Sequence, residues 1–207
     1  MITIKSKSIN EAWVELVKQI INYGYSPDDK EYYKAERTIV EIENPIIEAP
    51  HKFFPRNEQE LNIINNYLCT GENERDVWHE WTKLYYHRLF DSPNSQIEYI
   101  IKELSKKSGG KAVACTWRKE IDQDAERMPC MLTIWCQSRD GKIDLHVHGQ
   151  EGDIYKKSIM NMQEFVSLQR YLGNILNLKT GRFIFSLDFG FIFTKNKEHV
   201  LDIIKKL

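Results

Sequence analysis

The longest regular pattern in the sequence is the segment 155–176, in which apolar residues recur at the spacing of an α-helix. A shorter apolar segment precedes it at 143–148, and a longer one with β-branched and aromatic residues follows at 182–193. Segments of that kind are typical of β-strands. Because a long apolar helix has to bury its surface against other elements, the pattern predicts a central helix packed on a sheet. The expected fold class is therefore α+β, in two layers.

The other apolar segments extend this prediction along the chain. The Asp140-Gly141 pair favours a hairpin between two strands, because glycine tolerates the positive φ that such turns need. With roughly 150 residues per domain and no visible repeat or linker, 207 residues predict a single domain over 1–207 with a mostly sequential sheet. Further helices are predicted at 9–23, 58–68, 76–89, 95–104 and 199–207, and further strands at 38–42, 111–117 and 131–137.

Composition and charge argue against several classes of protein. Lys and Arg total 29 against 30 for Asp and Glu, which gives a formal charge of −1. A general nucleic-acid binder needs an excess of positive charge, so no nucleic-acid partner is expected. The mean hydropathy is −0.52, no apolar run is long enough to span a membrane, and the first residues lack the apolar core of a signal peptide. The expected location is the cytoplasm, with no membrane partner.

The four cysteines show no CxxC pair and no repeated spacing, so neither a disulfide framework nor a structural zinc site is expected. Most cysteines of cytosolic proteins are small buried hydrophobic residues. Cys130 differs because it follows Pro129 and opens an apolar segment, at the junction of a loop and a predicted strand. His146 and His148 alternate on another predicted strand. Two histidines without a third spaced ligand rarely form a metal site, and we expect no bound metal.

Short motifs follow one another in a fixed order along most of the chain. They are Trp78-His79-Glu80-Trp81, Tyr86-His87, Ser95-Gln96-Ile97, Trp117 with Asp122, Pro129-Cys130, Gln150 to Asp153, Asn161 and Phe191-Ile192-Phe193. This order resembles the thymidylate synthase family, in particular its shorter archaeal-type form and the related pyrimidine nucleotide hydroxymethylases. The segment 39–45 is also similar to the archaeal form. The resemblance implies a mixed sheet packed against helices and a homodimer formed through the sheet.

The resemblance gives three residues roles in pyrimidine chemistry. Cys130 stands at the position of the nucleophile, whose thiolate adds to C6 of a uracil ring and makes C5 nucleophilic. Asn161 stands where the family reads the base, since an amide can both donate to O4 and accept from N3–H; relatives acting on cytosine tend to carry Asp. Tyr86 matches a tyrosine of the proton-transfer network. The alternative for Asn161 is a surface amide on a helix, but its spacing from Cys130 favours the functional interpretation.

The resemblance also implies a cofactor, 5,10-methylenetetrahydrofolate. Asp153 matches the acid that holds the pterin ring, and Trp78 and Trp81 resemble a tryptophan pair beside folate. The alternatives are a carboxylate at the favourable start of a helix for Asp153 and core aromatic residues for the tryptophans. Residue types alone do not distinguish methyl from hydroxymethyl transfer.

Departures from the family fall on the phosphate clamp, which uses several arginines, two of them from the partner subunit. Gly110 and Lys111 stand at those two positions, Gln150 replaces a further arginine, and Glu151 replaces a serine. Phosphates are usually held by Arg forks, and each charged hydrogen bond is worth about 1.5–3 kcal/mol, so phosphate affinity should fall by several kcal/mol. Gln150 and Lys111 remain as candidate substrate contacts. The candidates for compensation are Arg37 on an early loop, Lys111, and the pair Lys156 and Lys157 on the next helix, although a solvated helix start is the favoured interpretation of that pair.

A second departure affects the sugar. Phe191 and Phe193 replace the histidine and tyrosine that bind the 3′-hydroxyl, so ordinary dUMP is a doubtful substrate. Two hypotheses remain open. The first is a folate-dependent methyl- or hydroxymethyl-transferase acting at C5 of a uracil-type nucleotide or nucleoside. The second is a catalytically degenerate, thymidylate synthase-like protein that binds a ligand or a partner. The retained Cys130 and Asn161 favour the enzyme.

Overall fold

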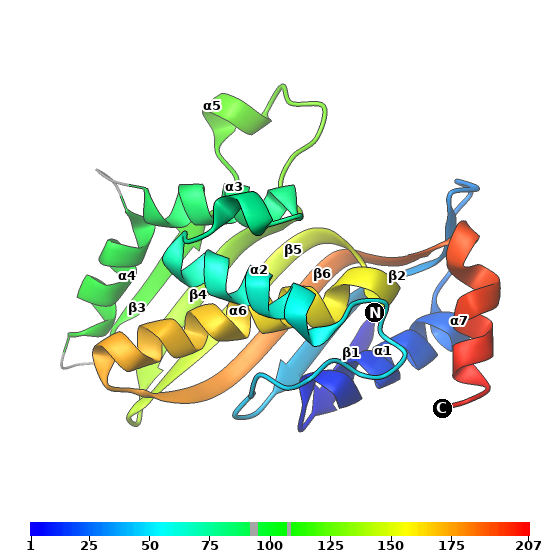
Figure 1. Cartoon of the computed structure of the whole chain (residues 1–207), viewed down its shortest axis with the longest axis horizontal. Coiled ribbons are helices and arrows are strands. Elements are labelled where there is room, and N and C mark those ends of the chain that lie inside the picture. The colour runs from blue at the N-terminus through cyan, green and yellow to red at the C-terminus, as the bar shows by residue number, and fades with distance from the viewer. Residues whose placement is uncertain (92–94, 107–108) are drawn as a thin grey trace.

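The computed structural model describes residues 1–91, 95–106 and 109–207 (Figure 1). The described residues form a six-stranded mixed sheet whose strands lie in the order β1-β2-β6-β5-β4-β3. β1 is parallel to β2 and β5 to β6, whereas the other neighbouring strands are antiparallel. The strands are β1 (Ile2–Ser6), β2 (Tyr32–Ile42), β3 (Lys111–Cys115), β4 (Met131–Arg139), β5 (Lys142–Asp153) and β6 (Lys179–Phe193).

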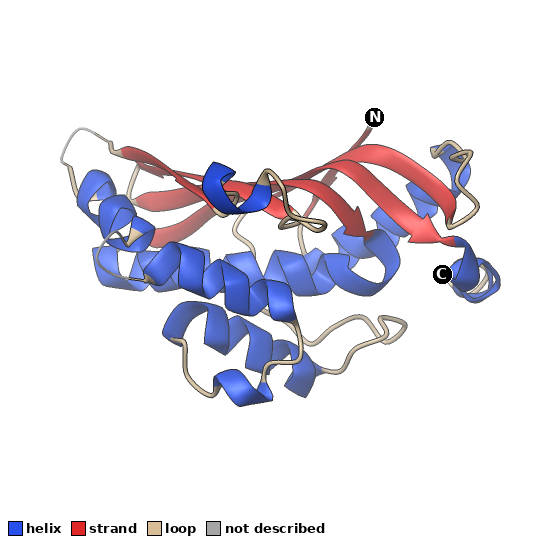
Figure 2. Cartoon of the chain, turned by 90° about the horizontal axis from the view of Figure 1, so that it is seen from above, coloured by secondary structure: helices blue, strands red, loops and turns tan. Residues whose placement is uncertain are grey.

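Helices cover one face of the sheet, as Figure 2 shows. α6 is buried around nearly its whole circumference because it lies between the sheet and α2. The short α5 and its loop project from the end of the molecule where α3 lies (Figure 1). The helices are α1 (Ile9–Tyr23), α2 (Glu58–Thr70), α3 (Glu80–Phe90), α4 (Gln96–Leu104), α5 (Lys119–Asp122), α6 (Ile154–Leu176) and α7 (Lys197–Ile204), with short 3-10 turns at Glu74–Asp76 and Thr194–Asn196.

The core lies between α6 and the inner face of the sheet. One row of side chains crosses all six strands in register, and every member is buried. The row consists of Ala114, Ile134, Val147, Phe185, Val40 and Ile4. It belongs to the same hydrophobic cluster as Phe165 and Leu172 of α6. Burying a large apolar side chain is worth about 1.5–3 kcal/mol, so this layer fixes the register of the strands.

The opposite, outer face of the sheet carries no helix in the parts of the chain that the structure describes (Figure 2). A second row in register lies on this face and includes Val113, Trp135, His146 and Ile184. The Val113 side chain is half exposed and the other three are partly exposed. We call these four residues the outer sheet face.

The β5–α6 junction positions the candidate site. β5 runs directly into α6, and Asp153 is both its last residue and the N-cap of the helix, where its carboxylate accepts a hydrogen bond from the Lys156 backbone N–H at 3.0 Å. α6 therefore begins at the end of the sheet where β4 starts and β6 ends. None of the helices in the described parts of the chain is both long and apolar enough to cross a membrane.

The predicted α+β fold with a mixed sheet is confirmed, as are a helix at Ile9–Tyr23 and the long central helix. Three predictions need correction. Strand β1 (Ile2–Ser6) was not predicted, because its alternating pattern is only five residues long. β2 lies beside β6, so the sheet is not sequential at that edge. The helix predicted at 76–89 begins at Glu80, since Val77 and His79 have extended backbones.

Candidate active site

A cavity of about 300 Å³ opens where the start of β4 and the ends of β5 and β6 meet α3 and α6. Cys130, Asp153, Asn161 and Trp81 all line it. The volume is at the lower end of the range of small-molecule sites, about 300–1,000 Å³. A more open hollow of about 1200 Å³ lies along β1 and α1, and none of these four residues lines it. We therefore take the smaller one, the Cys130 cavity, as the candidate active site.

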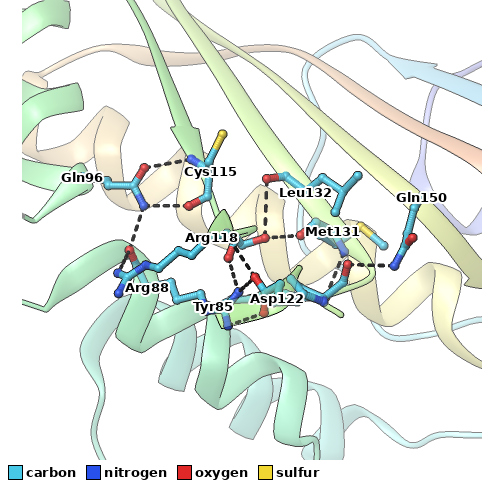
Figure 3. A network of polar contacts seen from close by, with 11 residues as sticks. Tyr85, Arg88, Gln96, Cys115, Arg118, Asp122, Met131, Leu132 and Gln150 are labelled. Atoms are coloured by element: carbon cyan, nitrogen blue, oxygen red, sulfur yellow. Dashed lines mark hydrogen bonds and ion pairs between the residues drawn. The ribbon is translucent and has the colours of Figure 1, made fainter. Parts of the chain in front are cut away.

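Cys130 immediately precedes β4 and is held through its backbone. Its carbonyl accepts a hydrogen bond from the Gln150 backbone N–H at 2.8 Å. The Gln150 side chain, labelled in Figure 3, donates to the Pro129 carbonyl at 3.2 Å. Burial raises the pKa of the Cys130 thiol, and the negative charge of Glu151 adds to this, while Lys157 and Arg127 oppose it. In this environment the resting thiol is protonated, and a bound ligand that shields Glu151 would favour the thiolate.

Tyr85, and not Tyr86, is the tyrosine beside Cys130. Its hydroxyl oxygen accepts a hydrogen bond from the Met131 backbone N–H at 3.1 Å (Figure 3), and its side chain is fully buried in the cavity wall. Burial holds the pKa of Tyr85 well above its usual range. Tyr86 points away, stacking on Phe90 at a ring distance of 4.9 Å. Consecutive helical residues differ by about 100°, so a one-residue shift moves a side chain to another face.

One face of α6 provides the opposite wall. Asp153, Lys157 and Asn161 follow at intervals of four residues, so their side chains stack along the helix and all line the cavity. Burial raises the pKa of the Asp153 carboxyl, although the Lys156 backbone N–H and the charges of Lys156 and Lys157 oppose the effect. The Asn161 side chain is 5% exposed and faces the same space as Cys130. The cavity thus combines a thiol, an amide and a carboxyl group.

Aromatic rings form the wall contributed by β6 and β2. Phe191 lies 4.8 Å from the ring of Phe193 and 4.8 Å from that of Tyr32, measured between ring centroids. Glu31 and Glu151 flank these rings in the cavity lining. This end of the cavity therefore offers apolar surface and negative charge, which disfavours a phosphate.

The loop between α5 and β4 supplies a second cation to the cavity, beside Lys157. The Arg127 guanidinium lies 5.6 Å from the ring of Trp81, a cation–π distance, and both residues line the cavity. Trp78 is about one-third exposed, carries the Arg56 guanidinium over its ring at 4.2 Å and does not line the cavity.

The other candidate residues lie elsewhere in the described structure. Lys111 opens β3 and lines a separate hollow with Gly109 and Arg139. Arg37 lies on β2, where its guanidinium is 3.4 Å from the carboxylate of Asp188. Gln150 is adjacent to the site but its amide N–H is used by Pro129, as described above. The chain itself does not bring Lys111 or Arg37 to the Cys130 cavity.

The sequence analysis missed Glu31, Tyr32 and Arg127 among the cavity residues, and it favoured a solvated helix start for Lys157. Lys157 carries a usable signal, because it lies four residues after Asp153 and four before Asn161 on a helix. Tyr32 and Glu31 carry none, since they reach the cavity only through the pairing of Tyr32 with Phe193 across two strands far apart in sequence.

Metal-binding side chains do not gather in the described structure. Among residues 1–91, 95–106 and 109–207, no group of three His, Cys, Asp or Glu side chains could hold a metal ion. His146 and His148 lie on β5 and contact the hydroxyl of Ser186 at 3.1 Å and the carboxylate of Asp188 at 2.8 Å, respectively.

Comparisons with known proteins give the class of the whole chain. No protein-family model matches the chain. The chain is 27% identical over 182 residues to a "Putative thymidylate synthase" of Methanosarcina acetivorans, covering 86% of this chain and 83% of the relative. It is 24% identical over 192 residues to a protein of the same description from Methanocaldococcus jannaschii, covering 88% and 86%.

The fold is similar to that of thermostable thymidylate synthase A from Bacillus subtilis. The TM-score is 0.74 at 15% sequence identity, over 96% of this chain and 84% of that one. Together with the sequence matches, this fold makes the chain a divergent, thymidylate synthase-like protein.

Proposed function

We propose that this protein is a folate-dependent enzyme that transfers a one-carbon unit to C5 of a uracil-type nucleoside or nucleotide. The relatives' description supports the general class of thymidylate synthase-type methyl transfer. One observation carries the proposal: Cys130, Asp153 and Asn161 come from a strand start, a strand–helix junction and a helix interior, yet line one cavity. We propose that the product carries a methyl or a hydroxymethyl group at C5, and that the protein acts in the cytoplasm.

In this proposal Cys130 is the nucleophile. Its thiolate forms a bond to C6 of the base, and the electron pair of the C5–C6 double bond moves toward O4, so that C5 becomes nucleophilic. Asn161 orients the base, because its amide can donate to O4 and accept from N3–H. Lys157 and Arg127 lower the pKa of the Cys130 thiol against the effects of burial and Glu151, so they help the thiolate to form.

The cavity residues fit the proposed cofactor, 5,10-methylenetetrahydrofolate. Asp153 offers a buried carboxyl that can accept paired N–H donors of a pterin ring, and Trp81 offers a ring on which the pterin can stack. When bound, the folate supplies the one-carbon unit. The role of the chain is to hold the two rings together and to exclude water from the thiol.

The aromatic wall of the cavity supports a substrate whose sugar end carries no negative charge. This wall consists of Phe191, Phe193 and Tyr32, and Glu31 and Glu151 lie beside it. A phosphate there would meet two carboxylates and an apolar surface. We therefore favour a nucleoside, or one with a modified sugar, over dUMP.

The proposal is tested by tritium release from C5-labelled deoxyuridine, dUMP and UMP, with and without methylenetetrahydrofolate. Release that requires the folate, and that is faster from deoxyuridine than from dUMP, is the expected result. A protein without the Cys130 thiol provides the blank. If no labelled pyrimidine loses tritium above this blank, the proposed transfer is wrong.

A second function, ligand binding without catalysis, is favoured by the environment of Cys130. Its thiol has a raised pKa beside Glu151, and the neighbouring Gln150 amide is already bonded to the chain. Pyrimidine binding measured by calorimetry, with no tritium release, would support this alternative.

We also propose that two copies associate through the outer sheet face. Trp135 lies in register between Val113 and His146, so a charge there would be buried at the interface. We expect wild-type protein to be a dimer by light scattering. Trp135→Glu should weaken the dimer about 100-fold or more. Ile175→Glu, at an exposed apolar residue of α6, is the control and should remain dimeric. A monomeric wild-type protein would contradict the proposal.

A further inference from the structure

Two carboxylates at one end of the Cys130 cavity have no ionic partner in the described chain. Glu31 directly precedes β2, Glu151 lies on β5, and both line the cavity. Neither takes part in an ion pair among the residues that the structure describes. Burial raises the pKa of the Tyr32 hydroxyl, and the charges of Glu31, Glu151 and Asp29 raise it further. Negative charge is therefore concentrated around one ring of the cavity wall.

Four aromatic rings pack together at this end, and we call them the aromatic cluster. The Tyr32 ring of β2 lies 5.2, 4.8 and 5.7 Å from those of Phe189, Phe191 and Phe193 on β6, measured between ring centroids. The faces of aromatic rings carry partial negative charge and attract cations. The chain provides an example, because the Lys195 ammonium lies 4.9 Å from the centroid of the Phe193 ring. Rings and carboxylates together suit a positively charged group of a ligand.

The cations of the cavity itself do not neutralise these carboxylates. Lys157 lies on α6, and Arg127 lies on the loop between α5 and β4, where its guanidinium contacts an indole ring as described above. Neither forms an ion pair with Glu31 or Glu151 in the described structure. A cation that pairs with the two carboxylates therefore has to come from the ligand.

A buried histidine indicates that a ligand completes the polar contacts of the cavity. His79, the N-cap residue of α3, lines the cavity and is only 7% exposed. Its Nδ1 lies 3.1 Å from the Thr82 hydroxyl, whereas its Nε2 has no partner among the described residues. Buried polar groups are nearly always paired, so a polar atom of the ligand is the expected partner of Nε2.

We propose that the substrate is a pyrimidine nucleoside whose sugar carries a primary amino group, bound as an ammonium ion by Glu31, Glu151 and the aromatic cluster; this inference rests on the proposed function. In that function Cys130 and Asn161 take the base, so the sugar extends toward the remaining wall, where the carboxylates and rings lie. An ammonium ion beside Glu151 also shields Cys130 from one of the negative charges that raise the pKa of its thiol. Binding of the amino group therefore favours the thiolate.

The test measures binding by calorimetry at pH 7 for deoxyuridine, 5′-amino-2′,5′-dideoxyuridine and 3′-amino-2′,3′-dideoxyuridine. At least one of the two amines should bind about 10- to 100-fold more tightly than deoxyuridine, because it adds a charged hydrogen bond and a cation–π contact. This advantage should shrink as the pH rises through the pKa of the amino group, because the neutral amine has the same size but no charge.

Variants of the two glutamates test whether the carboxylates cause the preference. Glu151→Gln keeps the shape of the side chain and should lower the ratio of amine to deoxyuridine affinity about tenfold, as expected for the loss of one charged contact. Glu31→Gln changes an exposed residue, and it provides the same test where Glu151→Gln does not fold. Glu43→Gln is the matched control, since Glu43 is exposed and does not line the cavity, and it should keep the wild-type ratio.

Equal affinities of the wild type for deoxyuridine and both amines would overturn the inference, and so would a preference that survives both glutamine substitutions. Tritium release from C5-labelled deoxyuridine and from the labelled amines is measured in parallel. Release without any preference for an amine leaves the proposed function standing and removes only the inference. No release from deoxyuridine or from either amine would overturn the proposed function, and the inference with it.

Discussion

Cys130→Ser is expected to abolish tritium release from any pyrimidine that the wild type accepts. A serine hydroxyl is not ionised near neutral pH and cannot replace the thiolate that the C6 adduct requires, so the rate should fall by roughly 10⁴-fold or more. Pyrimidine binding should change far less, because Asn161 and the aromatic wall are intact. The measurement is release from labelled deoxyuridine, with binding followed in parallel by calorimetry.

Cys115→Ser is the matched control, since Cys115 is an exposed free cysteine on β3 outside the cavity lining. It should keep the wild-type rate. Equal activity of Cys130→Ser and wild type would show that catalysis, if present, uses another nucleophile, and it would remove Cys130 from the proposed mechanism.

Much of this fold could be predicted because its elements have strong local patterns. Helices α1 and α6 carry apolar residues at helical spacing. The side chain of Ser8 caps the start of α1, and that of Asp153 caps the start of α6. The order of the strands in the sheet was harder to predict from the sequence. The neighbours of β6 are β2 and β5, and pairing of strands that are distant in sequence leaves no local signal.

The candidate site also has some residues that local sequence patterns predict and others that they do not. The spacing of Cys130, Asp153 and Asn161 predicted residues that the structure brings to one cavity, because each occupies a fixed position at an element boundary or on one helix face. The resemblance points to Tyr86, whereas the structure places Tyr85 in the cavity lining, and a sequence match does not show which helical face a residue occupies. The resemblance places Lys111 at a phosphate-clamp position, and Arg37 is a candidate for compensation, but the described chain places both on other surfaces.

Glu164 shows what sequence alone could not supply. A glutamate on a long helix is normally an exposed residue, and only the packing of α6 between the sheet and α2 makes this one fully buried. The same packing places it behind Asn161. A pattern of residue types therefore locates a candidate nucleophile and a candidate base-reading amide, but the burial of Glu164 depends on how α6 packs against its neighbours.

Arg88→Met is expected to lower the free energy of unfolding by about 3–5 kcal/mol, because it leaves the Asp122 carboxylate buried and unpaired. The Arg88 guanidinium contacts Asp122 at 2.5 and 2.8 Å and also donates to the Thr116 carbonyl, and Asp122 accepts from the Arg118 backbone N–H at 2.7 Å (Figure 3). These bonds fix α5 and the loop that brings Arg127 to the cavity, so the variant should also lose activity. Urea unfolding at pH 7 measures the first effect.

The pH dependence of stability and two further variants test whether the buried Arg88–Asp122 ion pair causes this loss of stability. Hydrogen bonds from Arg88 hold the pKa of Asp122 below its usual range, so the stabilisation is complete above about pH 4 and is lost as the pH falls through the lower, folded-state value. The difference in stability between Arg88→Met and wild type should therefore shrink below pH 4.

Arg88→Met combined with Asp122→Leu should recover much of the lost stability, since no charge remains buried. Lys205→Met, which removes an exposed ion pair with Asp202, should change stability by less than about 1 kcal/mol. An equally small change for Arg88→Met would mean that α5 is held by its other contacts, and that the position of Arg127 does not depend on this ion pair.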